Sequence, residues 1–203
     1  MADLVQVPGR PGQVYNPATG KVSKINEVFE DDIYDTVELA SGAVSAGTEA
    51  LFFNSLANKK FQHANTTTAA RIPSHHKLKL TRIGAHVRQV NNNADVPYAD
   101  SARIYEEFAL EFKLGQRLVT RRPLVTYQSG YGMSGGGVSL GMPSHAAAPR
   151  LAETQDVDDE TDLNGKVSYG GTAWTNATTA PSLSAYTLVT LFLHGMIAKP
   201  LGT

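Results

Sequence analysis

The chain has 203 residues, of which 41% are hydrophobic, and its 18 basic and 19 acidic side chains give a formal net charge of −1. This composition excludes collagen-like, coiled-coil and wholly disordered proteins, and the balanced charge gives no overall attraction to nucleic acid. The absence of cysteine excludes disulfide frameworks, zinc–thiolate sites and thiol catalysis. No apolar run is long enough to span a membrane, and the polar residues 1–6 lack the pattern of a secretory signal.

Residues 1–24 contain two turn clusters, at 8–12 and 16–20, with little apolar sequence between them. We therefore expect an extended N-terminal arm, followed by a single domain over residues 25–203. An arm of this kind lies over its own domain or reaches a neighbouring molecule.

From residue 25 onward, apolar and polar residues nearly alternate, which predicts β-strands. Segment 33–39 has this alternation, residues 51–53 are a short apolar run, and the polar residues 54–74 predict a long loop.

Segment 75–90 predicts a strand with a β-bulge. Its apolar side chains lie on even positions at Leu78 and Leu80 and on odd positions from Ile83 onward. A bulge at residues 81–82 would absorb this slip and keep one face of the strand buried.

Further strands are expected over residues 104–114, around Pro123 at an edge, and over residues 186–197. The last of these is apolar on both parities, which indicates a central strand covered on both faces. Residues 130–143 predict a glycine-rich loop and residues 146–165 an acidic one. With no amphipathic helix of three turns, the sequence predicts an all-β, two-sheet sandwich with long loops. Periodicity leaves open whether its topology is that of a jelly roll or of an immunoglobulin-like domain.

Several short motifs match known sites, but the surrounding sequence does not support them. Ser134 lies in a G-x-S-x-G pattern, and residues 130–135 match G-x-G-x-x-G, yet neither leads into a helix. The carboxylates of residues 156–162 lack the turn glycine of a calcium loop, so we interpret them as a solvated acidic loop. His75 and His76 would point to opposite faces of a strand. The sequence therefore predicts no catalytic residue, no cofactor site and no metal site.

The charged residues are segregated along the chain. Residues 25–49 contain acidic side chains and no basic one, residues 50–94 contain basic side chains and no acidic one, and residues 153–162 are again acidic. Blocks of opposite sign suit head-to-tail contact between copies, although they could also meet within one domain, or the basic block could bind phosphate. For contact between copies we expect four bases to pair with three acids of a neighbour: Lys77, Lys79, Arg82 and Arg88 with Asp31, Asp32 and Asp35.

The order of these features resembles the jelly-roll capsid proteins of tailless, often membrane-containing bacteriophages. The polar arm is followed by strand residues 33–37, by 51–53, by Arg-Ile-Pro at 71–73, by the strand around 108–114 and by a closing apolar strand that includes 191–195.

The resemblance covers about residues 25–198 and implies a single jelly roll in an icosahedral shell, as a major or minor coat protein. It further implies a virion protein, made in the host cytoplasm, that forms homo-oligomeric capsomers and contacts other capsid proteins, a viral membrane or the genome. The resemblance also implies that the protein has no enzymatic activity and no small-molecule substrate. The alternative is a β-sandwich module that binds a carbohydrate or another ligand, with or without calcium.

Overall fold

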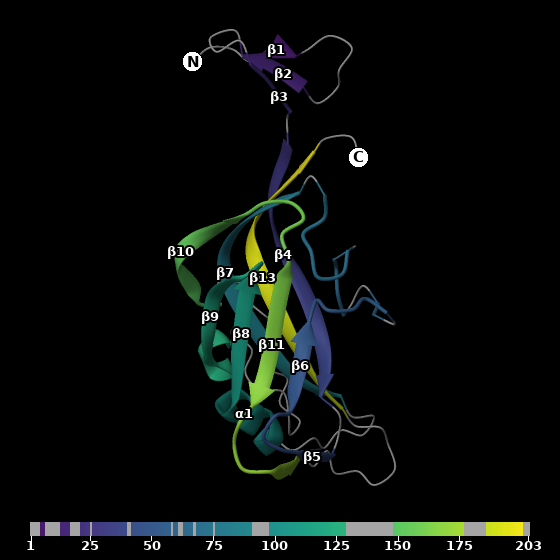
Figure 1. The fold of residues 1–203 in the computed structure, drawn as a ribbon, viewed down its shortest axis with the longest axis vertical. Coiled ribbons are helices and arrows are strands. Elements are labelled where there is room, and N and C mark those ends of the chain that lie inside the picture. The colour runs from purple at the N-terminus through teal and green to yellow at the C-terminus, as the bar shows by residue number, and fades with distance from the viewer. Residues whose placement is uncertain are drawn as a thin grey trace.

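The computed structural model describes residues 5–6, 13–16, 21–24, 26–39, 42–57, 59–60, 63–66, 68–74, 76–90, 98–128, 148–176 and 186–200. Most of these residues lie in two four-stranded antiparallel sheets that pack face to face (Figure 1). The predicted all-β sandwich is thereby confirmed. One sheet has the order β10-β7-β13-β4, with β10 (Arg150–Val157), β7 (Lys77–Val90), β13 (Tyr186–Pro200) and β4 (Asn26–Leu39). The other has the order β6-β11-β8-β9, with β6 (Glu49–Phe52), β11 (Leu163–Tyr169), β8 (Phe108–Leu114) and β9 (Arg117–Pro123).

The pairing of these eight strands follows a simple rule along the chain. The first pairs with the last, β4 with β13, and the second with the seventh, β6 with β11. The third pairs with the sixth, β7 with β10, and the fourth with the fifth, β8 with β9. The eight strands therefore form four nested antiparallel pairs, like a long hairpin that is folded over on itself. Two further pairings, β13 with β7 and β11 with β8, join the neighbouring pairs into the two sheets.

The inner faces of the two sheets form one hydrophobic core. In the β7 sheet the core residues include Ile33, Leu191 and Leu193, and in the β8 sheet they include Phe108 and Phe112, all of them buried. The alternating burial along β8 and β11 is the pattern expected of strands with one face in the core.

Gly165 in β11 packs tightly against the opposite sheet. A Cβ atom at this position would lie 2.9 Å from Cδ2 of Leu191 in the opposite sheet, so only glycine fits here without a shift.

The predicted bulge is present in β7. His194 of β13 pairs with Arg82, while the next residue, Gly195, pairs with Leu80, so that Thr81 is the extra residue. The Oγ1 atom of Thr81 donates a hydrogen bond to the carbonyl oxygen of His194 at 3.1 Å. The bulge keeps the apolar residues on both sides of it in the core: Leu78, Leu80, Ile83, Ala85 and Val87.

Residues 98–107 form the helix α1 (Tyr98–Glu107), which corrects the prediction that a strand begins at residue 104. Ile104 and Phe108 are four residues apart, a spacing that suits one face of a helix as well as one face of a strand. Tyr105 fastens the helix to β7, since its hydroxyl oxygen accepts the backbone N–H of Val87 at 2.9 Å. The helix lies at the end of the sandwich away from the start of β4 (Figure 1).

Part of the predicted acidic loop 146–165 is also strand. Its described residues contain β10 and the start of β11, and β10 pairs with β7 only through part of its length, with an irregular register between Arg150 and Gln155. The two acidic side chains of β10, Glu153 and Asp156, are both exposed, so this strand shows no clear apolar alternation. After β9 the chain forms a short 3-10 helix, η1 (Leu124–Tyr127).

The central position of β13 is confirmed, and its outer face is covered only in part. Leu188 and His194 are buried on that face, whereas Met196 is 47% exposed. The predicted cover on both faces therefore applies to only part of the strand.

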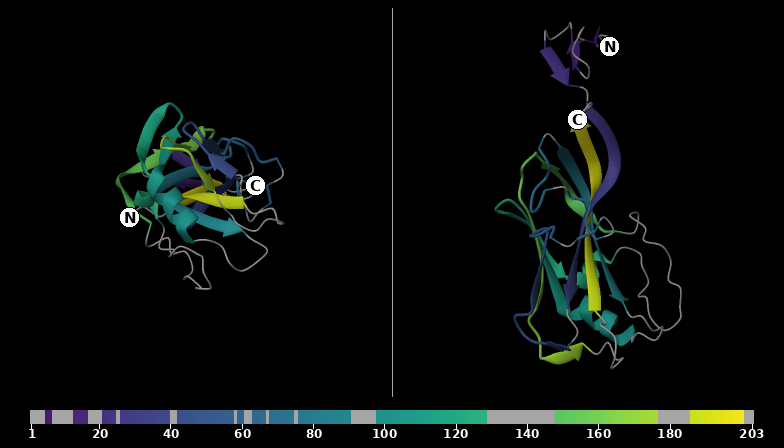
Figure 2. Two further views of the ribbon diagram at one scale, coloured as in Figure 1. Left: turned by 90° about the horizontal axis from the view of Figure 1, so that it is seen from below. Right: turned by 90° about the vertical axis from the view of Figure 1, so that its right-hand side faces the viewer.

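The described parts of residues 1–24 form three short strands, β1 (Val5–Gln6), β2 (Gln13–Asn16) and β3 (Lys21–Lys24). They pair with one another in a small antiparallel sheet. Figure 2 shows this sheet beyond the end of the sandwich where β4 begins and β13 ends. The two-stranded sheet of β5 (Gly42–Val44) and β12 (Trp174–Asn176) lies near the opposite end (Figure 1).

Candidate functional site

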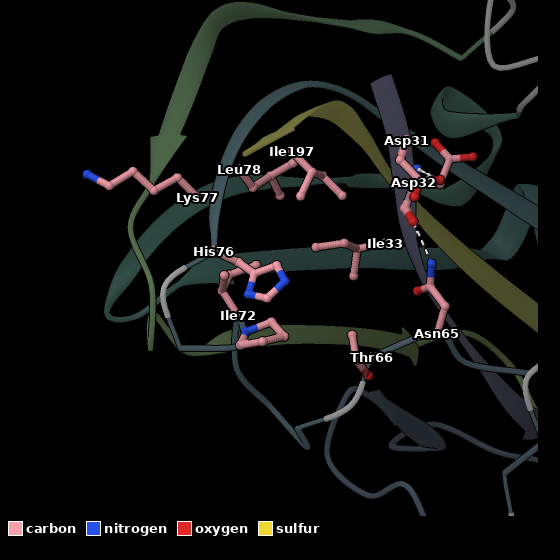
Figure 3. A pocket seen from close by; sticks show the side chains of 11 residues that line it. Asp31, Asp32, Ile33, Asn65, Thr66, Ile72, His76, Lys77, Leu78 and Ile197 are labelled. Carbon is pink, nitrogen blue, oxygen red and sulfur yellow. Dashed lines mark hydrogen bonds between the residues drawn. The ribbon is translucent and has the colours of Figure 1, made fainter. Parts of the chain in front are cut away.

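Three of the residues singled out from the sequence line one cavity of about 100 Å³, shown in Figure 3. Asp31 and Asp32 come from β4, and Lys77 comes from the start of β7. The Lys77 side chain points away from the cavity (Figure 3) and forms an ion pair with Asp158 at 3.0 Å. Because that ion pair favours the ammonium form, the pKa of Lys77 is raised above its usual value, chiefly by the hydrogen bond to Asp158.

The walls of the cavity are mainly aliphatic, and its rim is polar. Ile33 on β4 and His76 before β7 face each other across it (Figure 3). The His76 ring is positioned by a 3.0 Å contact between its Nδ1 and the carbonyl oxygen of Ser74. Thr66 also lines the cavity, and its buried Oγ1 atom has no hydrogen-bond partner among the described residues. The other apolar wall residues are Ile72, Pro73, Leu78 and Ile197.

Asn65 fixes the loop that closes one side of the cavity. Its Oδ1 accepts the backbone N–H of Tyr34 at 2.9 Å, and its Nδ2 donates to the carbonyl oxygen of Asp32 at 2.6 Å. The cavity is thus built by tertiary contacts, and it has the size and lining for a small apolar group with a polar substituent.

Asp35 lies inside the molecule rather than on a contact surface. It is completely buried, and the Nζ atom of Lys59 lies 2.5 and 2.7 Å from its two carboxylate oxygens. The backbone N–H groups of Thr36 and Phe53 also donate to this carboxylate. A buried carboxylate needs such partners, and with them in place Asp35 cannot pair with a base of a second copy.

Asp32 is nearly buried on the outer face of the same sheet, beside His194 of β13. The Nδ1 atom of His194 lies 2.8 Å from Asp32 Oδ1, and its Nε2 atom lies 3.0 Å from Glu30 Oε1. An imidazolium, which carries an N–H at each ring nitrogen, would donate to both carboxylates. This cluster ties β4 to β13 immediately beside the bulge of β7.

The remaining predicted residues have different surroundings. Asp31 and Lys79 are exposed. Arg82 is partly buried, and its guanidinium donates to the carbonyl oxygen of Ala148 at 2.9 Å. Arg88 lies on β7, and its side chain is outside the part of the chain that the structure describes.

Ion pairs within the chain connect the basic block to both acidic blocks. Lys59 pairs with Asp35, Arg71 with Asp162 at 2.8 Å, and Lys77 with Asp158. Ion pairs of this kind are required if the charge blocks meet within one domain, which was the alternative to contact between copies. The pairing of Lys77, Lys79, Arg82 and Arg88 with Asp31 and Asp32 of a neighbour stays a prediction.

A second charged group, which the sequence analysis missed, lies on the outer face of the β8 sheet. Glu111 of β8 is 2.9 Å from the Nζ atom of Lys113 and 3.6 Å from the Nε atom of Arg121 on β9. The hydrogen bond from Lys113 lowers the pKa of Glu111 below its usual value, against the opposing effect of burial. Residues 111 and 113 share a parity in the predicted strand, but the contribution of β9 depends on the register, which the sequence does not specify.

Other candidate motifs contribute no site. Ser134, the G-x-G-x-x-G pattern and His75 lie outside the described residues. Among the residues that the structure does describe, no three or more His, Asp or Glu side chains are grouped so that they could hold a metal ion. Within the same residues, no helix is long and apolar enough to cross a membrane.

A comparison with models of known protein families and a comparison with curated protein sequences find no match to this chain.

Proposed function

We propose that this protein is a virion structural protein that assembles with copies of itself into an icosahedral capsid shell, as a major or minor coat protein. The observation that carries this proposal is the strand pairing, in which β4 pairs with β13, β6 with β11, β7 with β10 and β8 with β9. This pairing supports the assignment of the sandwich as a single jelly roll, an eight-stranded fold common in viral capsid and lectin domains.

The position of residues 1–24 is consistent with an assembly role. Their described strands pair with one another and join neither four-stranded sheet. A segment that joins neither sheet of its own domain is available for contact with a neighbouring copy. The proposed partners are other copies, other capsid proteins, and a viral membrane or the genome beneath the shell. The proposed location is the virion, after synthesis in the host cytoplasm, and we assign no catalysis or cofactor.

The proposal is tested by the size of the purified protein. We expect sedimentation velocity and negative-stain electron microscopy to show rings, capsomers or shells whose population grows with protein concentration. Contacts that depend on charge should weaken in 1 M salt, where the screening length falls to about 3 Å. A monodisperse monomer at every concentration and salt condition would contradict the proposal.

The cavity in Figure 3 favours a second candidate function, a β-sandwich module that binds a small ligand. Its volume of about 100 Å³ and its unpartnered Thr66 hydroxyl suit a compact ligand with one polar group. This function predicts a monomer whose melting temperature rises with a particular glycan or other small molecule, or with calcium. A large assembly that is indifferent to such ligands would contradict it.

A further inference from the structure

Several cations of the basic block are already paired within the chain. In the basic block, Lys59, Arg71 and Lys77 each have an acidic partner within the chain. On β9, by contrast, Arg117 and Arg122 are exposed and have no ion-pair partner among the described residues. The other exposed cations without an ion-pair partner among the described residues, Lys60, Lys79 and Arg150, lie on separate segments, whereas β9 carries two such arginines on one strand.

β9 also has the composition of a protein contact. It lies at the edge of its sheet and pairs with β8 alone among the described strands. Leu118 on this edge is 51% exposed, and arginine is enriched in interfaces between proteins. We call this surface the arginine edge; its residues are Arg117, Leu118, Arg121 and Arg122.

The opposite side of the molecule carries a groove of about 510 Å³ beside β4 and β6. Glu38 of β4 and Glu49 of β6 line it, and both are exposed. Leu51, also in the lining, is 50% exposed. We call this surface the acidic groove, defined by Glu38, Glu49 and Leu51.

Basic side chains in and beside the groove reduce its charge only in part. Lys59 and His63 belong to the lining, and Lys59 is neutralised by Asp35. Lys166, which is not in the lining, pairs with Glu49 at 2.9 Å. Glu38 has no ion-pair partner among the described residues, so it remains as the uncompensated charge of the lining. The groove and the arginine edge therefore have opposite charge and a similar exposed apolar residue.

The placement of the two surfaces determines what kind of contact they can form. β6 and β9 are the two ends of the same sheet, and Figure 1 shows them on opposite sides of the sandwich. A contact between two different surfaces on opposite sides of one molecule repeats from copy to copy, and closes into a ring or continues as an open chain. Such a contact also leaves the sandwich itself unchanged.

We propose that the arginine edge of one copy binds in the acidic groove of the next, and that this heterologous contact joins subunits side by side. This inference rests on the proposed function, because it names the surfaces through which the protein would assemble. It assigns the contact to β9, β4 and β6 in place of the face of β7 that the sequence analysis selected.

The test is a charge-reversal experiment on the full chain. One variant combines Arg117→Glu with Arg122→Glu, which leaves Arg121 beside Glu111; the second is Glu38→Arg. We expect each variant to raise the critical concentration of assembly by about tenfold or more, because like charges would meet at every contact. The chain that carries all three substitutions should assemble again, because every contact then has reversed but complementary charges.

Two control variants isolate this effect from overall charge. Arg150→Glu and Asp156→Arg, both at exposed positions on β10, a strand that contributes to neither surface, should assemble as the unmodified chain does. Circular dichroism and the melting temperature establish that each variant is folded before its assembly is compared.

The outcomes separate this inference from the proposed function. A monomeric unmodified protein would overturn both. Assembly of the unmodified protein that neither reversal weakens, or that the triple variant fails to recover, would overturn the edge-to-groove contact alone. Reversed arginines that leave assembly intact but reduce binding of a DNA probe would assign the arginine edge to nucleic acid instead.

Discussion

At Gly195 the backbone of β13 passes so close to β7 that a side chain has no room. A Cβ atom there would lie 2.1 Å from the carbonyl oxygen of Lys79. This contact is a consequence of the bulge, because the extra residue Thr81 brings the backbone of β7 toward β13 at this point.

We expect Gly195→Ala to lower the free energy of unfolding by about 3 kcal/mol or more, since a clash with backbone atoms cannot be relieved by a side-chain rotation. Gly170→Ala is the matched control, because nothing lies within 4 Å of its added Cβ atom. Urea denaturation of both variants gives the comparison. Equal stability of the two variants would show that the strands separate at Gly195 at little cost.

Asp35 is a second residue whose role only the structure reveals. It lies on the apolar parity of β4, between Ile33 and Val37, but the sequence does not show that Lys59 is its partner in the interior. We expect Asp35→Ala to cost about 3–5 kcal/mol, because it removes one partner of a buried ion pair and the acceptor of two backbone N–H groups.

The control for Asp35 is Glu38→Ala on the same strand, at an exposed position, which should change stability by no more than about 0.5 kcal/mol. Thermal and chemical unfolding of the two variants measure the difference. If both substitutions cost the same, the Asp35–Lys59 pair does not stabilise the fold in the way that its burial indicates.

Among the secondary-structure elements, β7 was predictable from sequence in detail. The parity change between Leu80 and Ile83 located the bulge, because keeping one face in the core allows only one register on each side of it. The helix α1 was not predictable in the same way, since Ile104 and Phe108 fit both a helix and a strand. The strand β10 was hidden because its acidic residues face solvent and give no apolar alternation.

Deletion of Thr81 tests the bulge as an element. Without the extra residue, Leu78 and Leu80 would turn to the outer face or β7 would lose its pairing with β13. Burial of a leucine contributes about 1.5–3 kcal/mol, so we expect a loss of about 3–6 kcal/mol, enough to unfold many domains.

Thr81→Val is the milder variant for comparison. It keeps the bulge and removes only the hydrogen bond to the carbonyl oxygen of His194, which should cost about 1 kcal/mol. The melting temperatures of the two variants distinguish a requirement for the extra residue from a requirement for its hydroxyl.

For the whole molecule, the sequence predicted the sandwich but not which charges meet. The charge blocks at residues 25–49, 50–94 and 153–162 predicted attraction between basic and acidic side chains. The strand order brings some of these side chains together as ion pairs within the chain. His194 and Asp32 form a hydrogen bond although 162 positions separate them in the sequence, so no local pattern predicts this pair. The cavity at Ile33 and His76 was missed for the same reason.

Removal of residues 1–24 separates folding from assembly. Because β1, β2 and β3 pair only with one another among the described strands, we expect the melting temperature of the truncated chain to stay within about 4 °C of the full chain. If the proposed function is correct, large particles should be lost in electron micrographs while the sandwich remains folded. A truncated chain that is unfolded would instead make the N-terminal sheet part of the domain itself.

The pairing of the first strand with the last has a consequence for biosynthesis. In the ladder between β4 and β13, Asn26 lies opposite Pro200 and Leu39 lies opposite Thr187. The ribosome therefore translates β4 long before it translates β13. Until residues 186–200 have been translated, β4 and β7 lack the strand that lies between them. We therefore expect the nascent polypeptide to keep the apolar faces of both strands uncovered until then. It should depend on chaperones at that stage and complete the sandwich only once residues 186–200 have emerged from the ribosome.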